Sequence, residues 1–464
     1  MGRNGKKRPL SAGTWIMLVM LAVVIAGSAL VLGRLSSGAS VDLSKLNMNL
    51  LNLGQTEGGT NDTPYTQTAS PAGASAVYPG RERKAETNGT QGPEGTPEAG
   101  NTQAPAATAV PAPLDTAAAE TDGQPAEEER SFTLAAAGVL CLDSEVRKNS
   151  WNSEAKAYDY TDMLLLLKGE LHGDVNTVFL ENLLMESDKY TDTVAPESAA
   201  DLLREAGFTT VACGWAQARS KGAEGIGATR MALEERNLQP IGIRNDDDQE
   251  APGIVNVKGI RTAFLQYTGT VAAKTRKSME KDGTQLTVPE AEAGLIAREV
   301  SAARANGAEA VIVLINWGKT GKNQRAIAEA AAAAGADLII GGGSRAPEGA
   351  EYLTGADGGK VLCVWNPGSL LTGDRANVKR MSGYLLHAEI RSNGRGGVNV
   401  LAPEYTPVYT WKYKQDGRFY YRCVASDREA PDGMNDEQKK TMAKSKTAVD
   451  EALANSPLTI RETE

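Results

Sequence analysis

Histidine is almost absent from this chain. Only His172 and His387 occur in 464 residues, whereas histidine is the side chain that most often serves as a neutral metal ligand or a general base. The shortage limits the metal and acid–base chemistry that the chain can carry. Basic residues are also outnumbered, and the formal net charge of −9 argues against a nucleic acid as partner, because nucleic acids select a basic surface.

Cysteine is scarce as well, with 4 residues and no C-x-x-C pair. Without such a pair, the sequence gives no support for a zinc ribbon or for thioredoxin-type redox chemistry. We interpret the cysteines as buried free thiols that act as small apolar side chains. They are Cys141, Cys213, Cys363 and Cys423, the first three within apolar, strand-like runs.

Several catalytic signatures are missing too. There is no G-x-S-x-G nucleophile elbow, so neither Ser344 nor Ser369 has a recognisable triad to act in. The glycine-rich run at 341–349 lacks the G-K-[ST] ending of a Walker loop, although simple anion capture by its N–H groups stays open. The acidic run at 245–250 lacks the pattern of a calcium loop, and we interpret it as a solvated loop.

One long apolar run is present near the N-terminus. Residues 14–33 carry no charge, follow a basic cluster at 3–8, and are long enough to span a bilayer as a helix. The basic flank predicts a cytoplasmic tail at 1–13, a membrane anchor at 14–35 and an extracytoplasmic remainder. The alternative is a cleaved signal peptide, whose apolar region is usually about 7–15 residues long. We therefore expect a single-pass protein of the cell membrane.

Residues 36–130 are predicted to form a juxtamembrane stretch and a disordered linker. From about Gln55 onward the segment is dominated by Thr, Ala, Pro, Gly, Glu, Gln and Asn, with almost no large apolar side chain. Such a composition cannot bury enough surface to offset the entropy lost on ordering. A flexible coil of this length spans on the order of 50 Å, so we expect the folded part to stand clear of the membrane.

Strand and helix patterns alternate from Ser131 to about residue 425. Apolar runs such as 309–318 are typical of strands, and 197–207 is typical of a helix closed by a glycine. The leucine spacing of 158–171 predicts a further helix, and 287–307 predicts a long helix capped by Thr287.

This alternation predicts parallel strands joined by crossover helices. Turn residues at Lys258-Gly259 and Asp416-Gly417 predict hairpins, and hence some antiparallel pairs. The expected fold class is therefore α/β, with mixed sheets in layers over residues 131–425. Residues 426–464 are predicted to form a C-terminal tail with a polar surface helix.

Three segments of this pattern resemble the CapA capsule-synthesis family, which is linked to poly-gamma-glutamate capsules and is a distant relative of the calcineurin-like metallophosphoesterases. Residues 206–243 are similar to the family's "aGFdvvslANNHalDyGeeGlldTlelLeeagi", "VIVLINWG" at 311–318 resembles "vIVsiHWG", and "AAAGADLIIGGGSRA" at 332–346 resembles "liegGADlViGhHpHv". The resemblance covers about residues 131–425. It implies a metallophosphoesterase-like α/β/β/α sandwich with mixed sheets.

The departures from the family's motifs fall on its metal-binding positions. The Glu of the family's "NLE" is kept as Glu181, but His172 and His387 match no motif position, and we interpret both as structural or surface residues. The replaced positions are Val139 for the first-strand Asp, Phe179 for the Asn of "NLE", Trp215, Ala216 and Gln217 for "NNH", Ser220 for the following Asp, Asn316 for the His of "HWG", and Gly342, Gly343 and Arg345 for the histidines of "GhHpH".

The resemblance therefore implies a pseudoenzyme that binds no metal and no other cofactor. A two-metal phosphoesterase uses its ions to polarise phosphoryl oxygens and to generate hydroxide, and each ion needs about four to six ligands. Glu181 with the amides of Asn316 and Gln217 supplies one charged ligand. The run "GGGSR" resembles a histidine-bearing metal loop from which the histidines are gone.

We accordingly expect a membrane-anchored, non-catalytic protein that binds or organises an anionic envelope polymer of the poly-gamma-glutamate type, or its assembly machinery. The alternative is a hydrolase or transferase that acts on a capsule or wall polymer through a non-standard site. Nearby cations could replace the metal charge or be ordinary loop charges; they are Arg219, Lys221, Lys319, Lys322 and Arg345. The degenerate cleft is predicted to comprise Glu181, Gln217, Asn316, Trp317, Gly342, Gly343 and Arg345.

Overall fold

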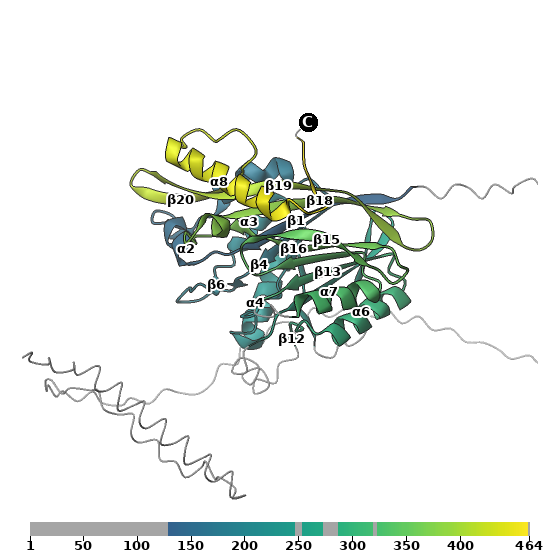
Figure 1. The fold of residues 1–464 in the computed structure, drawn as a ribbon. Coiled ribbons are helices and arrows are strands. Elements are labelled where there is room, and N and C mark those ends of the chain that lie inside the picture. The colour runs from purple at the N-terminus through teal and green to yellow at the C-terminus, as the bar shows by residue number, and fades with distance from the viewer. Residues whose placement is uncertain (1–128, 246–252, 272–285, 319–322, 463–464) are drawn as a thin grey trace, which may run out of the picture. The chain divides into compact units, whose positions relative to one another are not determined.

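The computed structural model describes residues 129–245, 253–271, 286–318 and 323–462 (Figure 1). The expected membrane anchor, nearly all of the linker, Lys319 and Lys322 lie outside these residues, as does most of the acidic run. Within the described ranges, no helix combines the length and the apolar character needed to cross a membrane.

One half of the fold is a nine-stranded sheet, counted within the described residues. Its strands are β1 (Ser131–Leu140), β4 (Val175–Leu180), β7 (Thr210–Ala212), β8 (Gln239–Ile241), β17 (Ser369–Leu371), β18 (Ser382–Ser392), β19 (Val398–Gln415), β20 (Arg418–Ala425) and β21 (Thr459–Ile460). The main path runs β20-β19-β18-β1-β4-β7-β8. β1, β4, β7 and β8 are parallel neighbours, whereas β18, β19 and β20 add antiparallel pairs.

The other half is a six-stranded sheet, again counted where the chain is described. Its strands are β10 (Ile254–Val257), β11 (Ile260–Thr268), β13 (Ala310–Asn316), β14 (Leu338–Gly342), β15 (Pro347–Thr354) and β16 (Lys360–Pro367). β11, β13, β14 and β16 run parallel, and β10 and β15 close the two edges as antiparallel hairpin partners. The predicted hairpin turns at Lys258-Gly259, where both φ angles are positive. The expected mixed α/β fold is confirmed.

Helices and short strand pairs complete the described part. The α-helices are α2 (Ser144–Ser150), α3 (Ala199–Ala206), α4 (Gly222–Glu234), α6 (Ala293–Ala305), α7 (Gln324–Ala333) and α8 (Asp436–Leu453). The 3-10 helices are η3 (Thr161–Met163), η4 (Leu165–Glu170) and η5 (Val378–Met381). The short strands are β2 (Trp151–Asn152), β3 (Ala157–Tyr158), β5 (Leu183–Leu184), β6 (Val194–Ala195), β9 (Arg244–Asn245) and β12 (Leu286–Thr287).

Three apolar cores separate the layers. Alternate side chains of a strand point to opposite faces of its sheet, so Ile312 and Leu314 of β13 face the nine-stranded sheet while Val311 and Val313 face α6 and α7. A third core lies between the nine-stranded sheet and α3 with η3 and η4. In Figure 1, α6 and α7 lie on one outer side of the sheets, whereas α8 packs against β18 and β19 of one sheet and against β15 of the other.

Two helix predictions are wrong in detail. The segment 158–171 forms the short 3-10 helices η3 and η4 rather than one α-helix, and its buried leucines at 164, 167 and 171 face a single core. His172 therefore lies in a loop after η4. The helix expected from Thr287 begins at Ala293 instead, because Thr287 pairs with Arg244 in the β12–β9 ladder.

Candidate functional site

The carboxyl ends of β4, β13 and β14 bring three of the predicted site residues together. Glu181 follows β4 directly, Asn316 is the last residue of β13, and Arg345 follows β14 in the glycine-rich loop. β13 and β14 are parallel, with Asn316 opposite Gly342. Because the ligands of α/β sheets gather beyond the carboxyl ends of parallel strands, this is the place where such a fold puts a functional site.

Both carboxylate oxygens of Glu181 are engaged. Asn316 Nδ2 donates to Oε1 at 3.0 Å, and Arg345 donates to Oε2 from Nε at 2.8 Å and from Nη2 at 2.5 Å. Glu181 comes from the nine-stranded sheet, whereas Asn316 and Arg345 come from the six-stranded sheet. The contact is thus an ion pair that joins the two sheets at their carboxyl edge.

This ion pair is mostly buried. The Glu181 side chain is 7% exposed and the Arg345 side chain 24%. Desolvation acts to lower the pKa of Arg345, but the neighbouring Cys141 and Glu181 outweigh it and hold that pKa above its ordinary value. A buried charge that loses its partner is strongly destabilising, so removing either member of the pair should weaken the fold.

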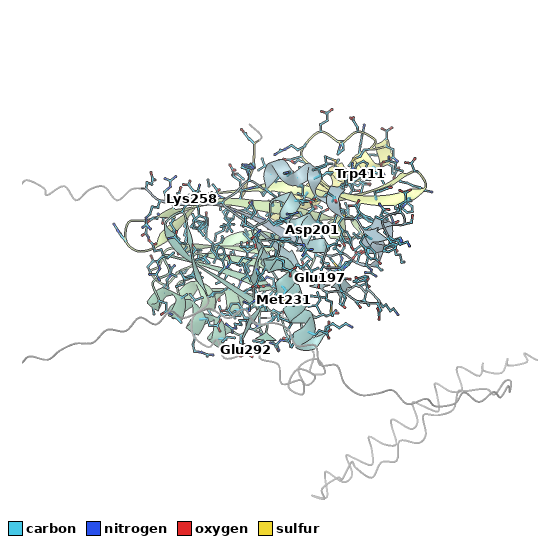
Figure 2. The ribbon with its side chains drawn as sticks, turned by 180° about the vertical axis from the view of Figure 1, so that it is seen from behind. Glu197, Asp201, Met231, Lys258, Glu292 and Trp411 are labelled. Atoms are coloured by element: carbon cyan, nitrogen blue, oxygen red, sulfur yellow. The ribbon has the colours of Figure 1, made fainter. Side chains whose placement is uncertain are left out.

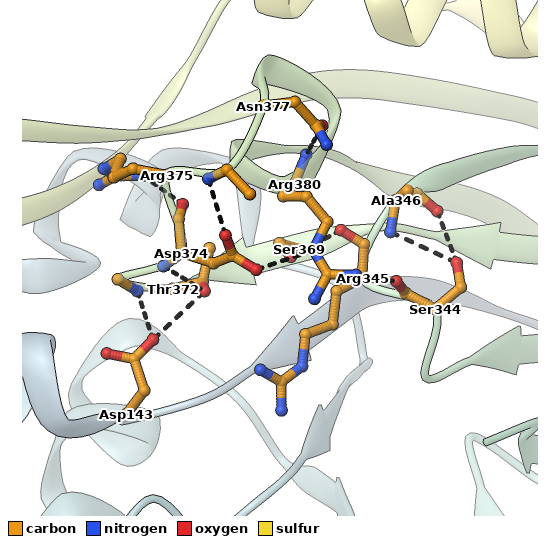
Figure 3. Close-up of polar contacts among 12 residues, drawn as sticks. Asp143, Ser344, Arg345, Ala346, Ser369, Thr372, Asp374, Arg375, Asn377 and Arg380 are labelled. Carbon is orange, nitrogen blue, oxygen red and sulfur yellow. Dashed lines mark hydrogen bonds and ion pairs between the residues drawn. The ribbon is translucent and has the colours of Figure 1, made fainter. Parts of the chain in front are cut away.

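The loop that carries Arg345 is fixed by neighbouring side chains, as Figure 3 shows. Arg345 itself has a positive φ of 58°, a conformation that costs energy for a residue with a side chain. Ser369 Oγ donates to the Arg345 carbonyl at 3.0 Å, and Asn366 Nδ2 donates to Ser344 Oγ at 2.8 Å. These contacts aim the guanidinium at Glu181.

A second group of charges borders this loop and was not foreseen from the sequence (Figure 3). Arg380 donates from Nη1 to the Ser344 carbonyl at 3.2 Å and from Nε to Asp374 Oδ2 at 2.8 Å. Arg375 lies with its guanidinium carbon 5.3 Å from the ring centroid of Tyr421. The available signal was the charged run that follows β17, "TGDRANVKR".

Asp143 completes this border from the segment after β1, the strand that pairs with β17. Its Oδ1 accepts from the backbone N–H groups of Glu145 and Val146 and so caps α2, while Oδ2 accepts from Gly373 N at 2.7 Å. Together with the Glu181–Arg345 pair, the site holds three arginines, at 345, 375 and 380, and three carboxylates, at 143, 181 and 374. Its local charge is balanced.

The remaining predicted residues fall in different places. Gly343 adjoins Asn316, since a Cβ built at Gly343 would lie 2.5 Å from Asn316 Oδ1. Trp317 is buried in the core under α6 and α7 and donates from Nε1 to the Trp365 carbonyl at 2.9 Å. Gln217 is exposed, and no hydrogen bond of the described residues joins its side chain to Glu181, Asn316 or Arg345.

The predicted nearby cations are not free charges at the site. Arg219 has its Nη1 3.8 Å from the Glu290 carboxylate, and its Nη2 donates to Thr287 Oγ1 at 2.8 Å. Lys221 is exposed next to the first turn of α4. Among the described cations, Arg345 is the one that contacts the predicted cleft residues directly.

The family model described as "Bacterial capsule synthesis protein PGA_cap" matches residues 133–368. This match contains β1, β4, β13, β14 and the Arg345 loop, and it spans half of the chain. The chain belongs to the PGA_cap family. Its resemblance to CapA-type capsule-synthesis proteins is thereby confirmed.

Individual relatives are more distant. The capsule biosynthesis protein CapA of Bacillus anthracis is 29% identical over 166 residues, which are 34% of this chain and 39% of that protein. The match therefore spans well under half of the relative's length.

Three solved structures are similar at 11% identity. Haemophilus influenzae NAD nucleotidase has a TM-score of 0.38, and the match covers 73% of this chain and 58% of that one. For a Thermus thermophilus 5'-nucleotidase precursor the TM-score is 0.37, with 69% of this chain and 58% of that one covered. For the Bacillus subtilis calcineurin-like phosphoesterase YfkN the TM-score is 0.36, with 70% of this chain and 99% of that one covered.

In this PGA_cap member, apolar or small residues stand at several of the positions that match the family's metal ligands, Phe179, Ala216 and Gly342 among them. The Phe179 ring lies against Gly342, where a built Cβ would be 3.0 Å from the ring's Cγ. Ala216 lies beside Gly318 at the same strand ends, since a built Cβ at Gly318 would be 3.8 Å from the Ala216 Cβ. A histidine side chain therefore does not fit at position 342 unless Phe179 is replaced as well.

The donor set does not fit a pair of divalent ions. A metal site needs several deprotonated donors that converge, whereas Glu181 has both oxygens committed to Asn316 and Arg345. Burial raises the pKa of the nearby Cys141 thiol to about 12, so that group is protonated at neutral pH. Within the described ranges, no group of three or more His, Cys, Asp and Glu side chains converges as metal ligands.

Proposed function

We propose that this PGA_cap member is a membrane-anchored, extracytoplasmic protein without catalytic activity that binds or organises an anionic envelope polymer of the poly-gamma-glutamate type, or the machinery that assembles it. Family membership supports the capsule context. The single observation that carries the non-catalytic part is that Asn316 and Arg345 occupy both oxygens of the Glu181 carboxylate.

The other reactive groups around the pair support the same conclusion. A hydrolase needs a base or a nucleophile that is free to act on a substrate. Ser369 Oγ is committed as a donor to the Arg345 carbonyl, and the Cys141 thiol is buried with a raised pKa. Ser344 Oγ donates to the Ala346 carbonyl at 3.1 Å and accepts from Asn366. Within the described residues, none of these hydroxyl and thiol groups is paired with a base.

Arg345 is the contact that we propose for an anionic polymer. Its side chain is 24% exposed, and its Nη1 has no hydrogen-bond partner within the described residues, so one edge of the guanidinium is available to a carboxylate. The balanced charge around it makes each contact weak and sensitive to salt. A polymer with a carboxylate on every residue compensates by making many such contacts along its length.

Binding of purified poly-gamma-glutamate to the full chain tests the proposal. We expect binding at low salt that weakens as salt rises, and a loss of at least about fivefold in affinity for Arg345→Ala. Arg345→Lys should lose part of this affinity, because it keeps the charge but not the planar donor edge. Arg395→Ala is the matched control, since Arg395 is exposed in the β18–β19 turn. Equal affinity of Arg345→Ala and the native chain would refute polymer binding at this site.

The non-catalytic part is tested separately by metal analysis and by turnover. We expect the purified full chain to contain Mn, Fe and Zn well below one equivalent and to leave simple phosphodiesters intact. Stoichiometric metal together with turnover that Glu181→Gln abolishes would instead support the alternative, a hydrolase or transferase of a capsule or wall polymer.

The membrane anchor rests on residues 14–33 and is proposed from sequence alone. Protease treatment of intact cells should cut the linker, release the folded part beyond residue 130 and leave a membrane-bound N-terminal fragment. Val23→Asp places a charge at the centre of the apolar run, which costs about 3 kcal/mol in insertion, and should shift the chain out of the membrane fraction. An unchanged distribution would contradict the anchor.

A further inference from the structure

A second candidate site lies at the open edge of the nine-stranded sheet, where β20 is the last strand of the main path. A cavity of about 150 Å³ is formed there by β20, the end of β19, η3 and the segment around β2 and β3. Figure 2 shows Trp411 of β19 at the end of the molecule opposite Lys258. The lining residues used below are Asp159, Tyr160, Asp162, Tyr413, Arg418, Tyr420, Tyr421 and Arg422.

Aromatic side chains are concentrated at this edge. The chain has 6 Trp, 13 Tyr and 5 Phe, and six of them fall within residues 409–421. Trp411, Tyr413 and Tyr420 form a stacked ladder, with ring centroids 4.3 Å and 5.4 Å apart and interplanar angles of 24° and 22°. Tyr413 and Tyr420 are only half-buried. Flat rings of this kind present a rigid surface with a polar edge to a ligand.

The charged residues of the cavity balance one another. Arg422 Nη2 lies 3.0 Å from Asp162 Oδ2, and the Arg422 guanidinium carbon is 5.3 Å from the ring centroid of Tyr413. Asp159 accepts from Thr161 through Oδ1 alone, which leaves Oδ2 available as an acceptor. With two aspartates and two arginines in its wall, the cavity favours a neutral ligand that has hydrogen-bonding groups over a polyanion.

Two tyrosine hydroxyls in the cavity wall have unmet hydrogen bonds. Tyr160 and Tyr421 are 3% and 1% exposed and line the cavity, and neither hydroxyl has a partner among the described residues. Burial raises the pKa of Tyr160, so this hydroxyl stays protonated and can both donate and accept. Both hydroxyl oxygens are themselves covered, so the hydrogen-bonding groups that the cavity offers a ligand come from Asp159 and Arg418.

From these observations we propose that the cavity is a binding subsite for one sugar ring of a neutral envelope glycan. Because about 10–15 Å³ is enough to hold one water, a cavity of about 150 Å³ has room for a ring-sized group and not only for a single water. The C–H face of the ring would lie on Tyr420, and the hydroxyls would bond to Asp159 and Arg418. The site uses none of the residues of the Glu181–Arg345 pair and takes a ligand of a different class, so it goes beyond the function proposed above.

Titration of the full chain with the tetramer of N-acetylglucosamine and with cellotetraose tests the subsite, with Trp fluorescence and calorimetry as readouts. We expect at least one of the two oligosaccharides to bind, with an affinity that does not change up to about 0.5 M salt, because no net charge is paired on binding. Tyr420→Ala should weaken binding by about tenfold, whereas Tyr420→Phe should keep most of it.

Controls separate this site from the rest of the surface. Tyr352→Ala removes a tyrosine that is 39% exposed on β15 of the other sheet and should leave affinity unchanged, and circular dichroism should show each variant folded. The proposal is overturned if neither oligosaccharide binds at about 10 mM, or if Tyr352→Ala loses as much affinity as Tyr420→Ala. Binding of poly-gamma-glutamate that depends on Tyr420 rather than on Arg345 would also overturn it.

Discussion

The imidazole of His387 accepts a hydrogen bond from Arg461, with 2.8 Å between Nδ1 and Nη1. Nη2 of the same arginine lies 3.2 Å from Nε2 of His172, so one guanidinium engages both histidines of the chain. Arginine keeps its protons, so both of these ring nitrogens are acceptors. The other nitrogens then carry the protons and donate to Thr406 Oγ1 at 3.1 Å and to the Gly169 carbonyl at 2.8 Å. The buried His387 is therefore neutral in the folded chain.

This arrangement predicts that acid weakens the fold. Burial lowers the pKa of His387 to about 3, and Arg461, His172 and Arg428 act in the same direction. The unfolded chain takes up this proton near pH 6.5, so it binds more protons than the folded chain below that pH. The free energy of unfolding should fall from pH 6.5 toward pH 3 by up to ~1.4 kcal/mol per pH unit for this group. Urea unfolding between about pH 7.5 and pH 4.5 measures the slope.

His387→Gln is the control for this prediction. Glutamine offers Arg461 an acceptor oxygen but does not titrate, so its slope should be flatter by about one proton. The carboxylates of Glu170 and Glu404, which lie around the same ring, are common to both proteins and cancel in the comparison. Identical slopes would mean that His387 takes up its proton over the same pH range in the folded and the unfolded chain, and that burial does not lower its pKa.

The Glu181–Arg345 pair should show strong energetic coupling. Arg345→Met leaves the Glu181 carboxylate buried without its cation, at an expected cost of about 3–5 kcal/mol in the free energy of unfolding. Replacing both residues by Met should cost clearly less than the sum of the two single changes, because the double variant has no unpaired charge. A double-mutant cycle in urea measures this coupling.

Arg230 and Glu234 provide the matched surface pair. They lie 2.7 Å apart on α4 with side chains 41% and 47% exposed, and their coupling should be about 0.3–0.5 kcal/mol. If the coupling of Glu181 with Arg345 is no larger than this, the inter-sheet pair does not hold the site closed.

Local signals explain which parts of the fold could be predicted. Gly207 ends α3 with a φ of 101° and caps it from its own backbone N–H, and the turn at Lys258-Gly259 is a two-residue signal. Both predictions depend on residues adjacent in sequence. The start of α6 did not follow from local pattern, because Thr287 is held in a ladder with Arg244, which is distant in sequence.

The sequence predicted which residues belong to the site, but not which of them contact one another. The motif comparison identified Glu181, Asn316 and Arg345 separately. Nothing in the sequence indicated that Arg345 would lie on Glu181, which is 164 residues away, since that depends on how two sheets pack. Gln217 is among the predicted cleft residues because it matches a motif histidine, but its side chain is exposed to solvent.

Gly342 should tolerate no side chain next to Phe179. A Cβ at Gly342 would lie 3.0–3.1 Å from three atoms of that ring, so Gly342→Ala should lower the free energy of unfolding by about 1–3 kcal/mol. Adding Phe179→Leu should recover part of this loss by making room. Gly169→Ala is the control, since nothing lies within 4 Å of its added Cβ. Equal effects of the two alanine substitutions, measured by urea unfolding, would contradict this close packing.

The four thiols should not react with thiol reagents in the folded chain and should react once the chain unfolds. All are buried and free, as expected from the sequence, and burial raises the pKa of Cys141 and of Cys213 to about 12 and also raises the pKa of Cys363 and Cys423. Because the thiolate is the reactive form, a thiol reagent near pH 8 should label none of them in buffer and all of them in urea. Cys141 adjoins Arg345, so its labelling reports on the Arg345 loop. If mass spectrometry found Cys141 labelled in buffer at the rate of a free thiol, the Arg345 loop would open readily. The ion pair with Glu181 would then not keep the site closed.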